Sequence, residues 1–90
     1  MKQEEKEEQR RQREELRERA KLKKEIEEAR LKITKDKQHY EIALKQAQER
    51  MNSEKDATKR ADLEQRIALF QEQLEKLGHE LEEVDYREAN

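Results

Sequence analysis

The sequence predicts an all-α protein: an antiparallel two-helix coiled-coil hairpin with a charged helical extension at its N-terminus. The first observation is composition, because 51% of the residues are charged and there is one glycine and no proline, as in long helices. The second is a pair of segments whose apolar residues recur with heptad spacing. The third is a polar segment between them, where the chain could reverse within a single domain.

Residues 1–21 are predicted as a charged single helix or a frayed lead-in to the first hairpin helix. They contain three apolar residues, so no face of such a helix could be buried. Oppositely charged residues lie four apart in the favourable order at Glu7–Arg11 and Glu15–Arg19. Each such pair stabilises a helix by roughly 0.2–0.5 kcal/mol, which favours a helical extension.

The first hairpin helix is expected to begin before Leu22 and to end at about Met51. Its apolar residues follow heptad spacing with one discontinuity near Asp36 and Lys37, where charged or polar residues interrupt the pattern. The seam residues predicted for this helix are Leu22, Ile26, Ile33, Tyr40 and Leu44.

The second hairpin helix is expected from about Lys55 to Tyr86, followed by a tail of residues 87–90. Its apolar residues alternate at intervals of four and three over three heptads, which is the strongest periodic signal in the chain. Gly78 lies beside this seam, where a small residue would let another helix come close, although glycine costs a helix roughly 1 kcal/mol relative to alanine. The predicted seam residues are Leu63, Ile67, Phe70, Leu74, Leu77, Leu81 and Val84.

A turn at about residues 52–55 is predicted from the polar segment, where Asn52 and Ser53 favour turns and helix N-caps. Residues 21–60 carry twelve basic and eight acidic residues, net +4, whereas residues 61–90 carry three basic and nine acidic residues, net −6. Antiparallel arms would place these opposite charges side by side, whereas a parallel homodimer would juxtapose like charges.

Reversal at this turn also aligns the two seams, with Tyr40 beside Ile67 and Leu22 near Val84. The alternative fold is a long parallel coiled-coil rod, in which the helix continues through the polar segment. Such a rod would be a homodimeric structural spacer or scaffold in a larger assembly.

The sequence offers no constellation for catalysis, cofactor binding or metal binding, so we expect a protein that is not an enzyme. There is no cysteine, and His39 and His79 are 40 residues apart. No apolar run is long enough to span a membrane and the N-terminus is unlike a signal peptide, so a soluble, cytoplasmic protein is expected.

Nucleic acid is the lesser alternative partner, with RNA binding by a helical hairpin as the model. Lys55, Lys59 and Arg60 would gather at the turn. Acidic residues interleave with them and no aromatic residue is near for base stacking, so the sequence argues against nucleic acid at this place.

Two aliphatic residues off the seam, Leu31 and Ile42, indicate a partner-binding face on the first helix. They are 11 residues apart and therefore share one side of the helix, which points away from Ile33. A two-helix hairpin is small enough to be stabilised by docking to something else. The expected partner-binding residues are Leu31, Lys35, Gln38 and Ile42.

Two segments of the chain resemble an HR1 repeat. They are KLKKEIEEARLKITKDKQHY at residues 21–40 and DLEQRIALFQEQLEKLGHELEEV at residues 62–84. HR1 repeats are antiparallel coiled-coil fingers that bind Rho-family GTPases. The similarity covers roughly residues 21–85, and Leu31-Lys32-Ile33 fits the start of the family pattern L-K-I-x-x-G-A.

The chain departs from that pattern at Asp36 and Lys37, which stand where the family has Gly and Ala. The resemblance implies contact with a Rho-family small GTPase on the first helix, at the same face. The sequence therefore predicts a coiled-coil interaction module whose partner is another protein, such as a small GTPase, or a second copy of itself.

Overall fold

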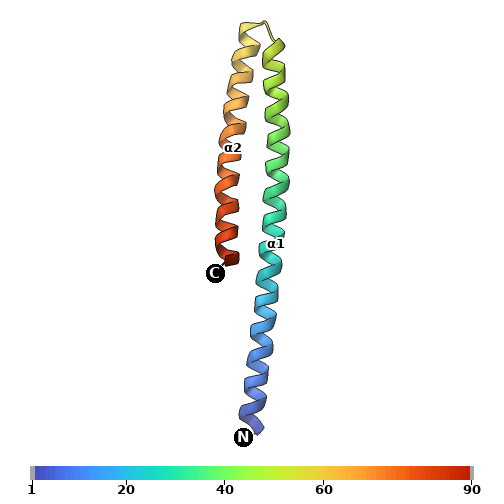
Figure 1. Ribbon diagram of the computed structural model, residues 1–90, viewed down its shortest axis with the longest axis vertical. Helices are drawn as coiled ribbons and strands as arrows, with labels where there is room; N and C mark the ends of the chain where they lie inside the picture. Colours follow the sequence, from blue (N-terminus) through green and yellow to red (C-terminus); the bar gives the residue numbers. More distant parts are fainter. Residues whose placement is uncertain (1, 90) are drawn as a thin grey trace.

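The computed structural model describes residues 2–89, which form two long helices: α1, Lys2–Ser53, and α2, Ala57–Ala89. The helices lie side by side and antiparallel, joined by a short turn at one end of the molecule (Figure 1). The molecule measures 82 × 16 × 15 Å along its principal axes. The predicted antiparallel hairpin with a helical N-terminal extension is confirmed, and the described chain turns back instead of forming a parallel rod.

The N-terminal extension, which we define as residues 2–25, continues α1 past the end of α2 (Figure 1). Every residue in it is exposed, and Ile26 is the first residue of α1 that is partly covered. Of the two forms expected for residues 1–21, the described residues 2–21 adopt the single helix, and Met1 lies outside the described residues.

The charge pairs expected to stabilise this extension do not close into ion pairs. Among the described residues, the basic side chains within 4.0 Å of a carboxylate oxygen are Arg30, Arg66 and His79, and none of these lies in the N-terminal extension. Such pairs would add little stability, because an exposed pair gains only about 0–1 kcal/mol. The extension is therefore helical through the propensity of Glu, Lys, Arg and Gln and through the paired helix that continues it.

The seam of α1 is continuous, and two basic residues take part in it. Arg30 and Lys37 are half-buried at seam positions. The sequence predicted a discontinuity near Asp36 and Lys37, but Lys37 occupies the seam position there. Long basic side chains fit because their methylene stems cover apolar surface while the charged ends reach the edge of the interface. The seam residues, at alternating intervals of four and three, are Ile26, Arg30, Ile33, Lys37, Tyr40, Leu44, Ala47 and Met51.

Leu22 does not belong to this seam, contrary to the prediction. It is 56% exposed. Counting back from Ile26, the alternating spacing of the seam requires a step of three residues, which reaches Lys23. Leu22 therefore lies one position away from the seam.

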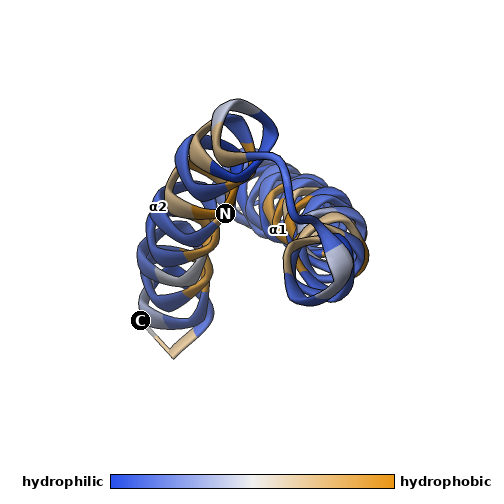
Figure 2. Ribbon diagram, turned by 90° about the horizontal axis from the view of Figure 1, so that it is seen from above, coloured by the Kyte–Doolittle hydropathy of each residue, from blue (hydrophilic) through white to orange (hydrophobic). Residues whose placement is uncertain are grey.

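α2 turns its apolar side toward α1, as Figure 2 shows in the hydrophobic colour that gathers on the facing side of this helix. Ala47 of α1 and three residues of α2 form the buried core, each 8% exposed or less: Leu63, Leu77 and Val84. The other predicted seam residues of α2 are half-buried: Ile67, Phe70, Leu74 and Leu81. Removing this apolar surface from water is the main force that pairs the helices.

The two helices pair about one helical turn away from the predicted register. Tyr40 lies beside Phe70, with ring centroids 6.1 Å apart, whereas Ile67 was expected beside it. The cause is the position of the turn, which residues 54–56 form, so that the arms reverse later in the chain than predicted. A later reversal moves every facing pair toward the C-terminus of α2.

Asp56 sets the start of α2. Its Oδ1 accepts hydrogen bonds from the backbone N–H groups of Thr58, at 2.9 Å, and Lys59, at 3.4 Å. Its carbonyl oxygen accepts the Arg60 N–H at 2.9 Å, the first bond of the helix. These are the bonds of an N-cap, which satisfies N–H groups that have no partner inside the helix. Ser53 instead donates its hydroxyl hydrogen to the Arg50 carbonyl, 3.2 Å away.

Arg60 closes the turn from the other side. Its guanidinium Nη1 donates to the carbonyl oxygens of Met51, at 3.1 Å, and Glu54, at 2.9 Å. Both carbonyls lie at or just past the C-terminal end of α1, where acceptors lack helical partners and a cation is favoured. One side chain of α2 therefore fixes the end of α1.

The second helix is longer at its C-terminus than predicted. It begins at Ala57 and runs to Ala89, so residues 87–89 of the expected tail are helical, and Asn90 lies outside the described residues. Gly78 is not needed for close approach, because a Cβ atom placed on it would meet nothing within 4 Å. The expectation that its small size admits another helix is not supported by the contacts within this chain.

Candidate protein-interaction face

The four residues predicted to bind a partner lie on one exposed side of α1, which we call the outer face: Leu31, Lys35, Gln38 and Ile42. Leu31 is 56% exposed and Ile42 is 59% exposed. Their separation of 11 residues corresponds to about 16 Å along the helix axis. The outer face therefore presents two aliphatic side chains with two polar ones between them.

The heptad seam determines where the outer face points. Ile33 is half-buried against α2 and follows Leu31 by two residues. A step of two residues turns an α-helix by about 200°, so Leu31 points away from the seam. Because the seam fixes how α1 is rotated against α2, the outer face is carried on a helix whose orientation is set by packing.

Four other large apolar side chains are exposed, and the sequence reasoning had not assigned them to a surface. Leu16, 64% exposed, and Leu22 lie in the N-terminal extension, while Leu69, 52% exposed, and Tyr86, 72% exposed, lie on α2. Leu69 could have been found from its position two residues after Ile67, because a step of two residues turns the helix by about 200° and points the side chain away from the seam. Singly scattered apolar residues are normal on protein surfaces, so they indicate no second face.

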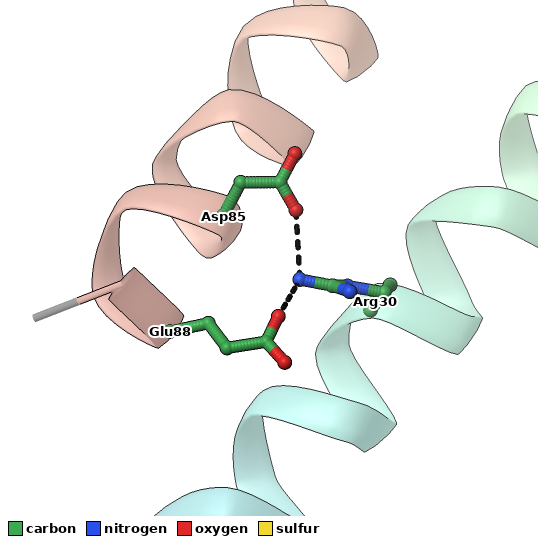
Figure 3. Close-up of polar contacts among 3 residues, drawn as sticks. All are labelled: Arg30, Asp85 and Glu88. Carbon is green, nitrogen blue, oxygen red and sulfur yellow. Dashed lines mark hydrogen bonds and ion pairs between the residues drawn. The ribbon is translucent and has the colours of Figure 1, made fainter.

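Arg30 of α1 contacts two acidic residues near the C-terminal end of α2, at the end of the hairpin opposite the turn (Figure 3). Its Nη2 atom donates to Asp85 Oδ1 at 2.7 Å and to a carboxylate oxygen of Glu88. Arg30 Nε is buried without a hydrogen-bond partner, so the guanidinium uses one corner of its fork. All three side chains are more than a third exposed, so each pair contributes no more than about 1 kcal/mol. The cluster holds the C-terminal end of α2 against α1.

A shallow groove runs between the two helices close to the turn. Ala43 and Ala47 on α1 leave room beside Leu63 and Phe70 on α2. Polar side chains border this apolar floor, including Arg66. The small alanine side chains let the helices lie close together, and they leave the groove open along one side of the seam.

Two further properties of the described residues concern metal binding and membrane spanning. Across residues 2–89 no group of three or more His, Asp or Glu side chains could hold a metal ion. On α2, His79 Nε2 lies 4.0 Å from Glu75 Oε1, and His79 Nδ1 lies 3.8 Å from Glu82 Oε2. On α1, His39 packs edge-on against the Tyr40 ring. Neither described helix has a stretch long and apolar enough to cross a membrane.

Comparison with known proteins finds no related protein. No protein-family model matches the chain, and no curated protein and no solved structure is significantly similar to it. The resemblance to HR1 repeats therefore stays a prediction, and the function has to be argued from the residues themselves.

Proposed function

We propose that this protein is a non-enzymatic coiled-coil interaction module that binds another protein through the outer face of α1. The observation that carries the proposal is the exposure of Leu31 and Ile42, 56% and 59%, on one side of a helix whose other side is held by α2. Apolar anchors surrounded by polar groups are the usual centre of a protein interface. Lys35 and Gln38 would supply the polar contacts.

The partner that we propose is a Rho-family small GTPase, on the strength of the HR1 resemblance. The antiparallel finger is the architecture that this resemblance implies, and the outer face is the surface that it implies for the partner. A hairpin presents such a face with little reorganisation on binding, because the seam already orders α1.

Titration calorimetry with a Rho-family GTPase loaded with a non-hydrolysable GTP analogue tests this proposal. The double variant Leu31→Glu/Ile42→Glu should weaken binding by more than tenfold, because it places carboxylates where apolar anchors must be buried. Leu69→Glu is the matched control, since Leu69 is equally exposed but on the other helix. Helicity by circular dichroism should be unchanged in both.

Equal loss of binding in the double variant and the control would contradict the outer face. Absence of binding by the unsubstituted protein would contradict the GTPase as partner. In that case the outer face is tested with the same two variants against proteins that co-purify with the chain.

A second candidate function is structural, as a spacer or scaffold element in a larger assembly. It is favoured by the 52-residue length of α1 and the 82 Å long axis of the molecule. RNA binding at the turn is less favoured, because Arg60 already uses its Nη1 donors for the carbonyls of Met51 and Glu54.

A further inference from the structure

A straight row of basic side chains follows one side of the N-terminal extension. Successive residues of an α-helix are turned by about 100°, which places these side chains within roughly 80° of arc. Four of them, Lys6, Arg10, Arg13 and Arg17, line one shallow surface hollow together with Gln9 and Glu14. We call this row the basic stripe, and it comprises Lys2, Lys6, Arg10, Arg13, Arg17 and Lys24.

Most acidic residues of the same segment lie on the other side of the helix, and Glu14 is the exception. Their mean direction is about 150° from the basic stripe, by the same helical geometry. The extension holds ten basic and eight acidic residues. Three of the basic residues, Arg11, Arg19 and Lys23, lie on the acidic side by the same geometry, so the separation of charge is partial. The main members of the acidic side are Glu4, Glu7, Glu8, Glu15 and Glu18.

The basic stripe is available to a partner. All of its residues are exposed, and none forms an ion pair among the contacts of residues 2–89. The acidic end of α2 stops near Arg30, so the extension projects beyond it (Figure 1). The stripe thus stands apart from the most acidic part of the molecule.

The length and spacing of the stripe suit the phosphate backbone of a nucleic-acid duplex. From Lys2 to Lys24 is 22 residues, or about 33 Å, the length of about ten base pairs. A duplex carries one charge per about 1.7 Å of its axis, and cations that neutralise phosphates release condensed counterions. A purely electrostatic surface can therefore bind a duplex without apolar anchors.

The other polyanionic partners fit the extension less well. An anionic membrane would require an apolar side on the helix, but the side away from the stripe is acidic. An acidic protein surface, including that of a second copy, would rely on exposed ion pairs, each worth from nothing to about fivefold in affinity. Such pairs do not offset the freedom lost when two proteins associate.

We propose that the basic stripe binds the phosphate backbone of double-stranded nucleic acid without sequence preference. This site lies N-terminal to the outer face on the same side of α1, since the seven residues from Lys24 to Leu31 make about two helical turns. It is separate from the basic residues at the turn. The sequence argued against nucleic acid at the turn, where acidic residues interleave. In the extension, helical periodicity places most basic and most acidic residues on different sides of the helix.

Fluorescence anisotropy with labelled DNA and RNA duplexes of about 20 base pairs tests the proposal. Six phosphate contacts predict a slope of about −5 for log K against log salt, or a loss of about 1000-fold between 50 and 200 mM NaCl. Exchanging neighbours by Arg13→Glu, Glu14→Arg, Arg17→Glu and Glu18→Arg keeps the composition and breaks the stripe. This variant should bind at least tenfold more weakly, with a slope reduced by about 2.

The matched control exchanges two charges on the acidic side, Arg11→Glu with Glu15→Arg, and should change affinity less than twofold. The double variant Leu31→Glu/Ile42→Glu should also bind the duplex, because it keeps all six residues of the basic stripe, apart from a small loss due to its two added charges on the same side of α1. Failure of GTPase binding and failure of duplex binding are therefore distinguishable.

The proposal is overturned if neither duplex binds at 50 mM salt, or if the stripe-breaking variant binds as tightly as the unsubstituted chain. It is also overturned if stripe-dependent binding appears only with vesicles containing phosphatidylserine. Stripe-dependent self-association in sedimentation, without duplex binding, would overturn it in favour of a second copy.

Discussion

The paired part of the hairpin, residues 26–89, and the N-terminal extension, residues 2–25, are both helical and rich in charge, but they are ordered by different means. The paired part buries Ala47, Leu63, Leu77 and Val84 at its centre. The extension buries nothing, and its side chains are all exposed. One helix, α1, passes through both environments without a break.

The comparison shows that helix formation and helix pairing are separate properties of this sequence. Pairing requires a heptad seam, which begins at Ile26. Helix formation requires only good helix formers and a nucleus, and the paired part supplies the nucleus from which the extension propagates. Charge then takes the place of apolar residues in giving the extension two distinct sides.

The largest expected change in stability, and the strongest test of the difference between the two parts, comes from removing a core side chain of the paired part. Leu77→Ala should lower the free energy of unfolding by about 2–4 kcal/mol, because Leu77 is 8% exposed and its removal leaves a cavity in the seam. Urea unfolding followed by circular dichroism measures the change.

The matched control is Leu16→Ala in the extension, where the side chain is 64% exposed. It should change the free energy of unfolding by less than about 0.5 kcal/mol. Equal destabilisation by both substitutions would mean that the extension has a tertiary partner.

A smaller effect is expected at the turn that joins the paired arms. Asp56→Ala removes the carboxylate that accepts the Thr58 and Lys59 N–H groups and should cost about 1 kcal/mol. Ser53→Ala, which removes one hydroxyl at the end of α1, should cost less. If the urea midpoint falls more for Ser53→Ala, the N-cap has been assigned to the wrong residue.

The smallest effect is a gain in stability. Gly78→Ala should raise the free energy of unfolding by up to about 1 kcal/mol, because alanine is the better helix former and its Cβ meets nothing within 4 Å. The thermal midpoint should rise by a few degrees. A fall would show that Gly78 faces a partner that comes close to the helix.

The hairpin fold could be predicted because seven apolar residues of α2 keep heptad spacing and because the two arms differ in charge. The register could not be predicted with the same success. It depends on which polar residue caps α2, and both Ser53 and Asp56 are good N-cap residues by type. Only the fold shows that the Asp56 carboxylate reaches the N–H groups of Thr58 and Lys59.

The roles of Arg30 and Lys37 were also hidden from sequence reasoning. A charged residue normally breaks an apolar pattern, so the seam was expected to be discontinuous near Lys37. Arg30 enters the seam because Asp85 and Glu88 stand across from it, and those partners are 55 and 58 residues away in the chain. The outer face was easier to find, since Leu31 and Ile42 lie off the seam in any register.

The closure of the turn by Arg60 has a kinetic consequence. The contact from Arg60 to the Met51 carbonyl joins residues nine positions apart, whereas Arg30 and Asp85 are 55 positions apart. Short loops close with the smallest loss of chain entropy, so the arms should pair in order from the turn, within microseconds to milliseconds for so local a topology. The end that carries Leu31 and Arg30 then forms last and opens first, and amide hydrogens there should exchange faster than those beside Leu63.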